Sequence, residues 1–544
     1  MTEVDPIFAA LTAPGQLFAL TEQDGQRVFA NMPPDLNLLI ESARRHGDKT
    51  FIVEGQTRLS FNDVFRLRDA LVGRLEIIAR GDRVAICMRN RAEWTIAFLA
   101  AIRAGGVPAL VNSRGAPAEL AAAVEDVTPV VVLADPERAA MLREGGYQGR
   151  IIETTDFPQS GDAGPPPSPA VPEDPAAILF TSGTTGRVKG AVLTHKSLMT
   201  GVMGMQLSGM MVLHGMAQKM GIAPEAIIAN MPQGAVLVVF PLFHISGLGA
   251  AFLSPMLAGS KIVIMRRWDP QEALRLIAEE RITQFTGVPT MLWDVLHGAK
   301  IDEADLTSLR NISSGGQALP VNLLDEIRAA CPQAMMGTGY GMTETSGMVA
   351  MASGEDFIRN RASAGRVLPL AEIRIEGPNG EDQPRGQAGE IVVRGPLVMQ
   401  GYWNRREDTA AVLSADGWLR TGDVGYIDDE GYIFIVDRKK DMVISGGENI
   451  YCAEVERVLG ELPEIIECST FGIPDERLGE LLVAVVVAKD ITEAQIIDHV
   501  AEHLARYKAP ARVAFSSTPL PRNAVGKIDK IYLRANWPHI IGDA

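Results

Sequence analysis

The sequence predicts an α/β fold of more than one domain, on the evidence of its length, its composition and its alternating helical and strand-like segments. At 544 residues the chain is too long for one ordinary core, since domains usually hold roughly 100–200 residues. Hydrophobic residues make up 47% and charged residues 22%, which is close to average globular usage and disfavours a disordered or fibrous protein. We therefore expect layered α/β sheets around a sizeable core.

The first 150 residues show the alternation most clearly. "RLSFNDVFRLRDALVGRL" has helical periodicity after a capping Ser60, "RVAICMRN" is typical of a strand, and "AEWTIAFLAAIRAGGVPALV" predicts a helix that ends at glycines. Such alternation favours parallel α/β layers. The stretch from Thr155 to Pro175, "TDFPQSGDAGPPPSPAVPEDP", is rich in proline, glycine and polar residues, so we expect an exposed connector.

Two later apolar runs, Ala235 to Phe243 and Leu481 to Ala488, predict buried strands. Both are far shorter than the roughly 20 residues that a membrane-spanning helix needs, so no transmembrane segment is predicted. The first residues, "MTEVDPIFAA", carry acids where an export signal would carry lysine or arginine, and no long apolar segment follows. We therefore expect a cytoplasmic protein.

Charge and cysteine content exclude two further classes. The net charge of -16 repels a phosphate backbone, so general nucleic-acid binding is not expected, and an anionic ligand must be bound by a local site. The cysteines Cys87, Cys331, Cys452 and Cys468 are far apart and form no CxxC pair. This spacing indicates neither a disulfide framework nor a zinc knuckle, and it fits a reducing compartment.

The segment "TSGTTGRVKG", from Thr181 to Gly190, is the first candidate binding loop. It follows the apolar strand "AAILF" directly, and a brief extended piece and a helix follow it. Glycines let backbone N–H groups approach phosphate oxygens, while the hydroxyls and Lys189 add further donors. A Walker loop requires Ser or Thr directly after a Gly-Lys pair, whereas Lys189 lies between Val188 and Gly190. The loop is therefore expected to hold a triphosphate without belonging to a P-loop NTPase.

Five more motifs follow in order: "SSGGQALP" (Ser313 to Pro320), "YGMTE" (Tyr340 to Glu344), "GWLRTGD" (Gly417 to Asp423), "DRKKDMVISGGENIY" (Asp437 to Tyr451) and "PRNAVGK" (Pro521 to Lys527). With the loop, they resemble the adenylate-forming superfamily of acyl-CoA synthetases, firefly luciferases and peptide-synthetase adenylation domains. The resemblance spans the chain from about Ala176 onward, and "SGGENIY" followed by "AEVERVL" is most similar to the acyl- and aryl-CoA ligases.

The resemblance implies a two-domain enzyme. Residues 1–438 would form a large amino-terminal domain of layered α/β sheets with the ATP and acyl sites, and residues 439–544 a small, mobile α+β lid with a hinge at Lys440. The implied reaction is attack of a carboxylate on the α-phosphorus of ATP, which gives acyl-AMP and pyrophosphate, followed by attack of the coenzyme A thiol. ATP, Mg²⁺ and coenzyme A are the implied cofactor and co-substrates.

The resemblance also implies roles for individual residues. Lys527 would bring the two anionic reactants together, and Glu344 would bind Mg²⁺, a cation that prefers carboxylate and phosphate oxygens. Lys189 and Thr184 would act on the triphosphate. His244 in "PLFHISG" would separate the acyl site from the thiol channel, although a buried core histidine would give the same pattern.

The remaining implied contacts bind the nucleotide or coenzyme A. Tyr340 would stack on adenine, Asp423 would accept hydrogen bonds from the ribose hydroxyls, and Arg438 would add a donor on the same side. The full set of these cofactor-binding residues is Thr181, Ser182, Gly183, Thr185, Gly186, Gly315, Gly316, Gln317, Tyr340, Gly341, Met342, Thr343, Asp423, Arg438, Lys440, Gly446, Gly447 and Glu448.

Several alternatives stay open at this stage. The acid can be a fatty or an aryl acid, with medium or long apolar chains preferred because no ionic anchor is evident near "PLFHISG" or "TGVPTML". The methionine-rich stretch from Met199 to Met220 is either an adaptable acyl wall or ordinary core. The acceptor can be a carrier-protein phosphopantetheine, or the chain a non-catalytic ATP-binding module. The oligomeric state is open, with a homodimer as one option.

One metal motif is rejected from the sequence. His499 and His503 stand four residues apart on a predicted helix, but Val500 occupies the position where a zincin needs glutamate. We therefore expect a solvated helix face.

Overall fold

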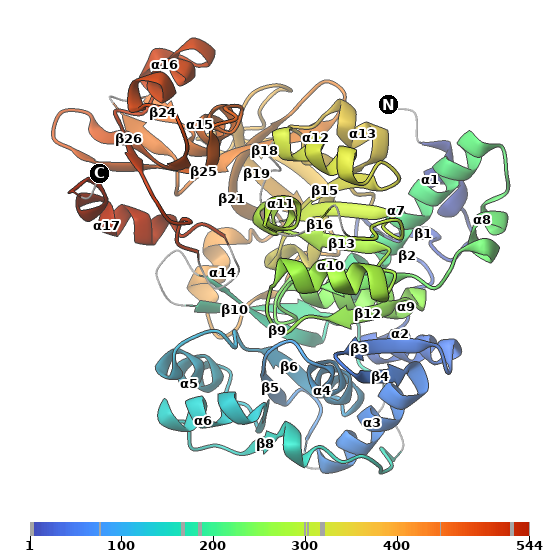
Figure 1. The fold of residues 1–544 in the computed structure, drawn as a ribbon. Coiled ribbons are helices and arrows are strands. Elements are labelled where there is room, and N and C mark those ends of the chain that lie inside the picture. The colour runs from blue at the N-terminus through green and yellow to red at the C-terminus, as the bar shows by residue number, and fades with distance from the viewer. Residues whose placement is uncertain are drawn as a thin grey trace.

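The computed structural model describes residues 5–75, 78–164, 169–182, 188–298, 301, 304–315, 321–445, 448–522 and 527–542. Within these residues the strands form sheets of seven, thirteen and five strands and one two-stranded hairpin. In Figure 1 the two largest sheets lie in the body of the molecule, and the five-stranded sheet lies in a separate lobe at the carboxyl-terminal end. No helix in the described part of the chain is long and apolar enough to cross a membrane.

The seven-stranded sheet is built mainly from the amino-terminal third, in the order β20-β10-β9-β6-β5-β7-β8. Strands β5 to β8, which come first in the sequence, pair in parallel. This pairing confirms the layers predicted from the alternation of elements. Ser60 caps the helix that follows it in a capping box with Asp63, as expected. The elements are β5 (Arg83–Cys87), β6 (Val107–Leu110), β7 (Val131–Ala134), β8 (Ile151–Glu153), β9 (Pro175–Ser182), β10 (Val188–Thr194), β20 (Gly401–Tyr402), α3 (Phe61–Arg74), α4 (Ala92–Arg103), α5 (Pro117–Asp126) and α6 (Pro136–Glu144).

The thirteen-stranded sheet forms the centre of the molecule, in the order β18-β19-β21-β22-β17-β16-β15-β14-β13-β11-β12-β3-β4. Strands β3 to β15 along this order pair in parallel, and the pairs from β15 to β18 are antiparallel. The strands are β3 (Thr50–Glu54), β4 (Thr57–Ser60), β11 (Ala235–Val238), β12 (Lys261–Ile264), β13 (Gln284–Gly287), β14 (Asn311–Gly315), β15 (Met335–Met342), β16 (Gly347–Ser353), β17 (Gly365–Val367), β18 (Glu372–Glu376), β19 (Gly389–Arg394), β21 (Leu419–Ile427) and β22 (Tyr432–Arg438).

Helices cover this central sheet and line its edges (Figure 1). The longest is α7 (His195–Met220), which Thr194 caps at its start and Gly221 ends in the left-handed conformation. The other helices are α2 (Leu36–Glu41), α8 (Pro224–Asn230), α9 (Ser254–Ala258), α10 (Pro270–Glu279), α11 (Pro289–His297), α12 (Val321–Ala330), α13 (Gly354–Arg359) and α14 (Arg406–Val412); α1 (Pro6–Leu11) and the hairpin β1 (Leu20–Gln23) and β2 (Gln26–Phe29) complete the amino-terminal part.

The carboxyl-terminal lobe is a small α+β unit with its own hydrophobic core, as expected. Its longest strand pair is antiparallel, and a third strand adds in parallel. The elements are β23 (Val443–Ser445), β24 (Glu448–Ile450), β25 (Ile465–Asp475), β26 (Gly479–Ala488), β27 (Arg512–Phe515), α15 (Cys452–Leu459), α16 (Glu493–His503) and α17 (Lys530–Gly542). The predicted strand at Leu481 to Ala488 is thus confirmed within β26.

The prediction of one strand from Ala235 to Phe243 was wrong in its length. Strand β11 ends at Val238, and the chain then turns into a π-helix at Ser246–Leu253. The turn is held by Asn90, whose amide donates to Phe240 O at 2.8 Å and accepts from Leu242 N–H at 2.9 Å. A side chain thus replaces the neighbouring strand as partner, and Pro241 has no N–H for a ladder. His244 therefore follows a turn and not a strand.

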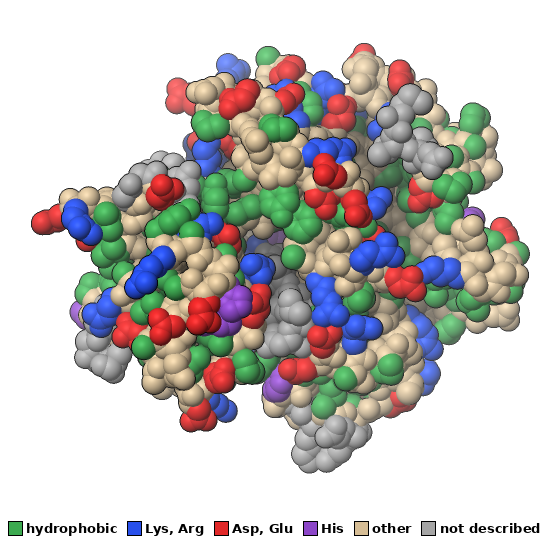
Figure 2. Space-filling view, turned by 90° about the horizontal axis from the view of Figure 1, so that it is seen from above, with side chains coloured by type: hydrophobic (Ala, Val, Ile, Leu, Met, Phe, Trp, Pro, Cys, Tyr) green, Lys and Arg blue, Asp and Glu red, His purple; other side chains and the backbone are tan. Residues whose placement is uncertain are grey.

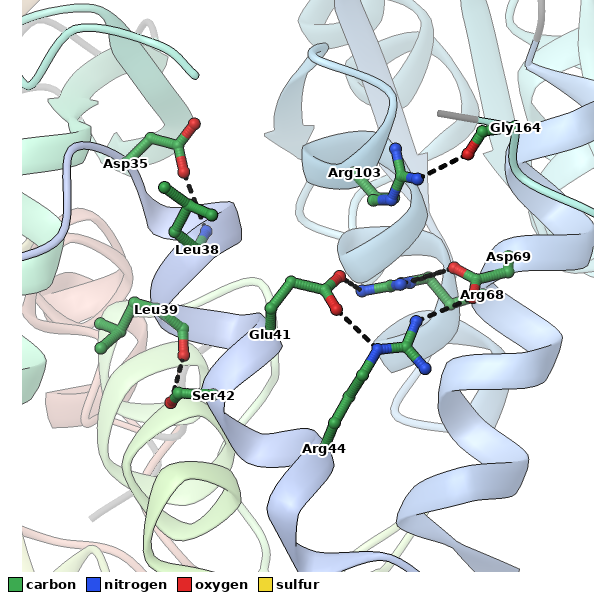
Figure 3. Close-up of polar contacts among 10 residues, drawn as sticks. All are labelled: Asp35, Leu38, Leu39, Glu41, Ser42, Arg44, Arg68, Asp69, Arg103 and Gly164. Carbon is green, nitrogen blue, oxygen red and sulfur yellow. Dashed lines mark hydrogen bonds and ion pairs between the residues drawn. The ribbon is translucent and has the colours of Figure 1, made fainter. Parts of the chain in front are cut away.

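A charge network around the buried Arg68 joins the amino-terminal helices (Figure 3). Arg68 of α3 is fully buried and binds Glu41 at 2.5 Å and its neighbour Asp69 at 2.8 Å. Arg44 bridges the same two carboxylates at 2.6 and 2.8 Å. Because every charged group here has a partner of opposite sign, the network fixes α2 against α3 without an uncompensated charge.

Candidate functional site

One large cavity, of about 2650 Å³, collects most of the predicted site residues. It opens between the carboxyl-terminal lobe and the rest of the molecule, where Figure 2 shows a hollow. Its walls come from segments far apart in the sequence, which include the ends of β14, β15, β21 and β22. The predicted residues that line it are Thr181, Lys189, His244, Gly315, Tyr340, Gly341, Met342, Thr343, Glu344, Asp423, Arg438, Lys440 and Lys527.

Other predicted residues fall elsewhere. Gly183, Thr184, Thr185, Gly186, Gly316, Gln317, Gly446 and Gly447 lie outside the described residues. Ser182 ends β9, where it pairs with Val188 across the hairpin. Glu448 begins β24 with its side chain exposed, and it is not part of the cavity wall formed by the described residues.

The backbone around the first loop supports the rejection of a Walker motif. Strands β9 and β10 form an antiparallel hairpin, with Lys189 opposite Thr181. In a P-loop the strand leads through the loop directly into a helix. Here a second strand intervenes, and α7 begins only at His195.

Asp423 is the centre of one polar group in the cavity. Strand pairing places it opposite Arg438, whose Nε lies 3.0 Å from Asp423 Oδ1. The Tyr340 hydroxyl donates to Asp423 Oδ2 at 2.8 Å. Burial and the neighbouring Asp423 carboxylate raise the pKa of Tyr340, so this hydroxyl stays a donor at neutral pH. Each carboxylate oxygen can accept a further hydrogen bond, which leaves room for a diol ligand.

Glu344 is a buried carboxylate next to this group, with 6% of its surface exposed. It lies in a single 3-10 turn, Thr343–Thr345, that follows β15. The Tyr402 hydroxyl donates to Glu344 Oε1 at 2.8 Å, and Met399 N–H donates to Glu344 O at the same distance. Burial raises the pKa of Glu344 and the Tyr402 hydrogen bond opposes this effect.

Glycines allow the backbone around Glu344 to pack closely. A Cβ on Gly341 would lie 2.0 Å from Gly347 O, on the neighbouring strand β16. A Cβ on Gly201 of α7 would lie 2.4 Å from Ser346 O, and Ser346 itself has a φ of 52°. Both glycines therefore hold the turn that carries Glu344 against its surroundings.

Lys189 projects from β10 to an acidic partner. Its Nζ lies 2.6 Å from Oδ1 of Asp408 on α14 and 5.3 Å from the centre of the Tyr402 ring. Lys189 and Glu344 thus share the neighbour Tyr402, and the ammonium is already paired. An anionic ligand that binds Lys189 must therefore compete with Asp408.

Lys527 and His244 reach the cavity from different lobes. Burial and the nearby cations Arg438 and Lys440 lower the pKa of Lys527 to about 8, while Asp423 opposes this effect. Burial also lowers the pKa of His244 to about 4, with contributions from the charges of Lys527 and Arg114. His244 is therefore neutral at neutral pH. The effect of the Lys527 charge on His244 indicates that the carboxyl-terminal lysine lies near the turn after β11.

Three neighbours of the site were not predicted. Tyr402 and Asp408 contact Glu344 and Lys189, and Arg114 acts on His244. Their signals in the sequence are weak, since the segment "GYWNRRED" reads as an aromatic turn followed by a charged helix start. Each of the three interacts with a residue more than 50 positions away in the sequence. Local sequence patterns do not predict interactions over such separations.

The two-lobed α/β fold, with buried carboxylates and lysines around a cavity between the lobes, defines a nucleotide-dependent ligase of the adenylate-forming class. The chain belongs to the AMP-binding enzyme family, because the sequence profile of that family matches residues 39–403. The profile of the AMP-binding enzyme C-terminal domain matches residues 454–527.

Individual relatives agree with this assignment. The chain is 35% identical to an indoleacetate–CoA ligase of Aromatoleum aromaticum, over 89% of this chain and 94% of the relative. It is 33% identical to a long-chain-fatty-acid–CoA ligase of Mycobacterium tuberculosis, over 85% and 89%. A solved o-succinylbenzoate CoA synthetase of Bacillus subtilis, in complex with its acyl-adenylate intermediate, superposes with a TM-score of 0.77 at 30% identity, over 92% of this chain and 97% of that one.

Proposed function

We propose that the protein joins an apolar carboxylic acid to coenzyme A at the expense of ATP, with acyl-AMP as the intermediate. The observation that carries the proposal is the convergence of residues from six separated motifs on one cavity. The relatives named above are CoA ligases, and the solved relative holds an acyl-adenylate.

Each polar group of the cavity has a role in this reaction. Asp423 accepts from the ribose hydroxyls, with Arg438 and Tyr340 holding its carboxylate in place. Lys189 leaves Asp408 and binds the departing phosphates. Lys527 reduces the repulsion between the substrate carboxylate and the α-phosphate, so that acyl-AMP and pyrophosphate form.

Glu344 is the residue that would hold Mg²⁺. A buried carboxylate with one oxygen fixed by Tyr402 provides the hard oxygen donor that Mg²⁺ prefers. When bound, Mg²⁺ neutralises charge on the phosphates. Tyr402 orients the carboxylate for this task, and the Met399 N–H holds the backbone of Glu344 in place.

The thioester step requires a rearrangement of the carboxyl-terminal lobe. We propose the domain boundary at 438/439 and the hinge at Lys440, which lies exposed in a turn between β22 and β23. Hinge residues lie at the ends of elements because they absorb changes of φ and ψ. After rotation, Lys527 withdraws and the segment around Glu448 approaches, with His244 separating the acyl site from the thiol channel.

The acid is an apolar one, with a medium or long chain or an aryl group. The cavity exceeds the roughly 300–1,000 Å³ of typical ligand sites, so it has space beyond the nucleotide. Methionines from α7 and from the segment that follows α8 provide an adaptable apolar wall. They are Met205, Met210, Met216, Met220 and Met231.

A panel of acids tests the proposal directly. Purified protein is offered fatty acids of increasing chain length and several aryl acids, with ATP and Mg²⁺, and pyrophosphate release is measured with and without coenzyme A. We expect AMP and pyrophosphate with apolar acids, and a thioester only when coenzyme A is present. Transfer to a phosphopantetheinylated carrier protein instead of coenzyme A would favour the alternative acceptor. ATP binding without AMP formation from any acid would favour a non-catalytic module.

The acid chain length that the cavity accepts is tested by placing a bulky side chain on the apolar wall. Gly209 of α7 lines the cavity, and a Cβ there meets no atom within 4 Å. Gly209→Phe should therefore raise the KM for long-chain acids while short acids are still activated. Gly215→Phe is the matched control, because Gly215 lies on the same helix outside the cavity wall formed by the described residues.

Two further expectations concern the oligomeric state and the location of the protein. A homodimer is one option for the oligomeric state, and light scattering of the purified protein decides it. A cytoplasmic location fits the predicted chemistry, and fractionation of cells that express the protein tests it.

A further inference from the structure

A second group of potential ligands lies in the carboxyl-terminal lobe, where α15 and α16 pack against each other (Figure 1). Glu461, His499 and His503 each place one ligand atom so that all three lie within 4.8 Å of one another. Glu461 follows the end of α15, and both histidines belong to α16. The reaction proposed above assigns no role to any of the three.

The structure corrects the expected solvated face at this point. His503 is exposed as expected, but His499 is only partly exposed, and the missing carboxylate comes from another element. The zincin pattern places glutamate directly after the first histidine. It therefore does not detect Glu461, which lies 38 positions before His499.

The protonation state of His503 suits a metal ligand. Its Nδ1 lies 2.8 Å from the backbone oxygen of His499. A carbonyl oxygen only accepts, so Nδ1 must carry the proton. In the neutral ring Nε2 then keeps its lone pair, and a backbone carbonyl that fixes the tautomer in this way is a common outer contact of metal-bound histidine.

His499 offers an unsatisfied nitrogen in the same place. Its Nε2 is buried and has no hydrogen-bond partner among the described residues. Buried polar atoms without partners are uncommon in folded proteins, and a bound ion or water commonly satisfies them. The His499 and His503 rings lie 4.3 Å apart between centroids, and one ligand atom of each lies within 4.8 Å of the other.

Glu461 supplies the charge. Its Oε1 pairs with Arg457 Nη1 at 2.6 Å, which orients the carboxylate. No pairing of Oε2 occurs among the described residues, so this oxygen is open to a cation. Arg457 is half exposed, and a metal that displaces it releases its guanidinium to water.

We propose that Glu461, His499 and His503 bind one divalent transition-metal ion, with Zn²⁺ as the best match. Two imidazoles and one carboxylate are zinc ligands, whereas Mg²⁺ prefers an all-oxygen site. Tetrahedral Zn²⁺ requires its ligand atoms about 3.4 Å apart at the usual bond lengths. Side-chain rotations close the remaining gap. The ion connects the end of α15 to α16 and leaves one coordination position for water.

The experiment uses the full-length protein, freed of metal by a chelator and kept in excess Mg²⁺. Zn²⁺ is titrated in competition with a chromophoric chelator, and we expect one Zn²⁺ per chain. His499→Ala and His503→Ala should each raise the dissociation constant for Zn²⁺ by at least about tenfold. Changes even in the outer contacts of a metal site lower metal affinity by 10–100-fold. Glu461→Gln should weaken it as well.

A matched control comes from another histidine next to a glutamate. His297 Nε2 lies 2.9 Å from Glu326 Oε2, a pair with only one imidazole. His297→Ala should leave Zn²⁺ binding unchanged. Zinc held by cysteines would persist in the double variant His499→Ala/His503→Ala, so it is subtracted as background.

Two independent readouts accompany the titration. Co²⁺ in the parent should give the intense visible absorption of a tetrahedral site, and this absorption should disappear in the histidine variants. Zn²⁺ should also raise the thermal midpoint of the parent but not of His503→Ala, whose side chain is exposed and whose loss leaves the fold intact. The proposal fails if the parent binds no Zn²⁺ in excess Mg²⁺, or if the double variant binds it as tightly as the parent.

Discussion

Lys527 is removed from water near two cations, Arg438 and Lys440, and the carboxylate of Asp423 only partly offsets their effect on its pKa. Burial and its neighbours Arg438 and Lys440 lower its pKa to about 8, so its charge is easily lost. Two anions in the cavity would stabilise that charge. In the proposed reaction the lysine would interact most strongly when ATP and the acid are both bound, which is the behaviour expected of a group that acts on the transition state.

Substitution of this lysine tests that role. Lys527→Ala should lower the rate of pyrophosphate release by about 10²–10³, because one transition-state donor is lost. Lys489→Ala, an exposed lysine of the same lobe, should leave the rate unchanged. Adenylation by Lys527→Ala at the parent rate would contradict the assignment.

Tyr402 gives a second test at the scale of one atom. Tyr402→Phe removes the hydroxyl that donates to Glu344 Oε1, and hydrogen bonds to charged groups contribute about 1.5–3 kcal/mol. The pKa of Glu344 should rise further, and the Mg²⁺ concentration for half-maximal pyrophosphate release should rise several-fold. Tyr426→Phe, which removes a hydroxyl from a ring stacked on Phe434, is the control. An unchanged Mg²⁺ requirement would show that Tyr402 does not support the metal site.

Among the elements, the turn between β22 and β23 is the proposed hinge between the two lobes. β22 carries Arg438 in the cavity wall, and Lys440 lies exposed two residues later. A rotation at this turn would move the carboxyl-terminal lobe and leave the sheet of the large domain unchanged.

Rigidity at this turn should separate the two half-reactions. Lys440→Pro fixes one φ angle, so adenylation should persist while thioester formation falls by at least about tenfold. Lys440→Ala keeps the backbone free and should support both steps. Single-turnover measurement of AMP formation and of thioester formation distinguishes the two. Equal loss of both steps in Lys440→Pro would argue against a hinge.

The network of Arg68 fixes α2 against α3 and concerns stability instead of catalysis. Arg68→Leu removes the buried member of the network, while Glu41 and Asp69 keep Arg44, and should cost about 1.5–3 kcal/mol, the usual contribution of hydrogen bonds to charged groups. Arg66→Leu, half exposed on the same helix, should cost less than about 1 kcal/mol. Thermal unfolding with circular dichroism compares the two.

The same network predicts a dependence on pH. Burial by itself would raise the pKa of Glu41, but Arg44 and Arg68 lower it below its ordinary value of 4.5. A lowered pKa contributes stability above the unfolded value, and this contribution is lost as the pH falls through the folded value. The difference in thermal midpoint between parent and Arg68→Leu should therefore shrink in acid. A difference that grows below about pH 4 would contradict the role of Glu41.

At the scale of the whole molecule, the contact between the lobes predicts the pH range of the proposed adenylation step. Lys527, which belongs to the carboxyl-terminal lobe, has its pKa lowered to about 8 by burial in the cavity and by Arg438 of the other lobe. His244, with a pKa of about 4, stays neutral across the same range. We therefore expect Lys527 to set the alkaline limit of the pH profile of pyrophosphate release.

The pH profile should follow that group. kcat/KM for pyrophosphate release reports the free enzyme and should fall above about pH 8 as the ammonium loses its proton. kcat should fall only at higher pH, because bound ATP raises the pKa of Lys527. Lys527→Arg should lose the alkaline decline, since guanidinium stays charged. A parent profile flat from about pH 7 to about pH 9 would refute this dependence.

The sequence by itself determined the fold class, the family and the residues of the six motifs, because local periodicity and motif order are properties of neighbouring positions. It also determined the helix after Ser60 and the strand at Leu481 to Ala488. The tertiary structure alone decided the turn that Asn90 imposes before His244, the pairing of Lys189 with Asp408 and the meeting of Glu461 with His499 and His503. These contacts join residues far apart in the chain, and only the packing of sheets and lobes fixes such distances.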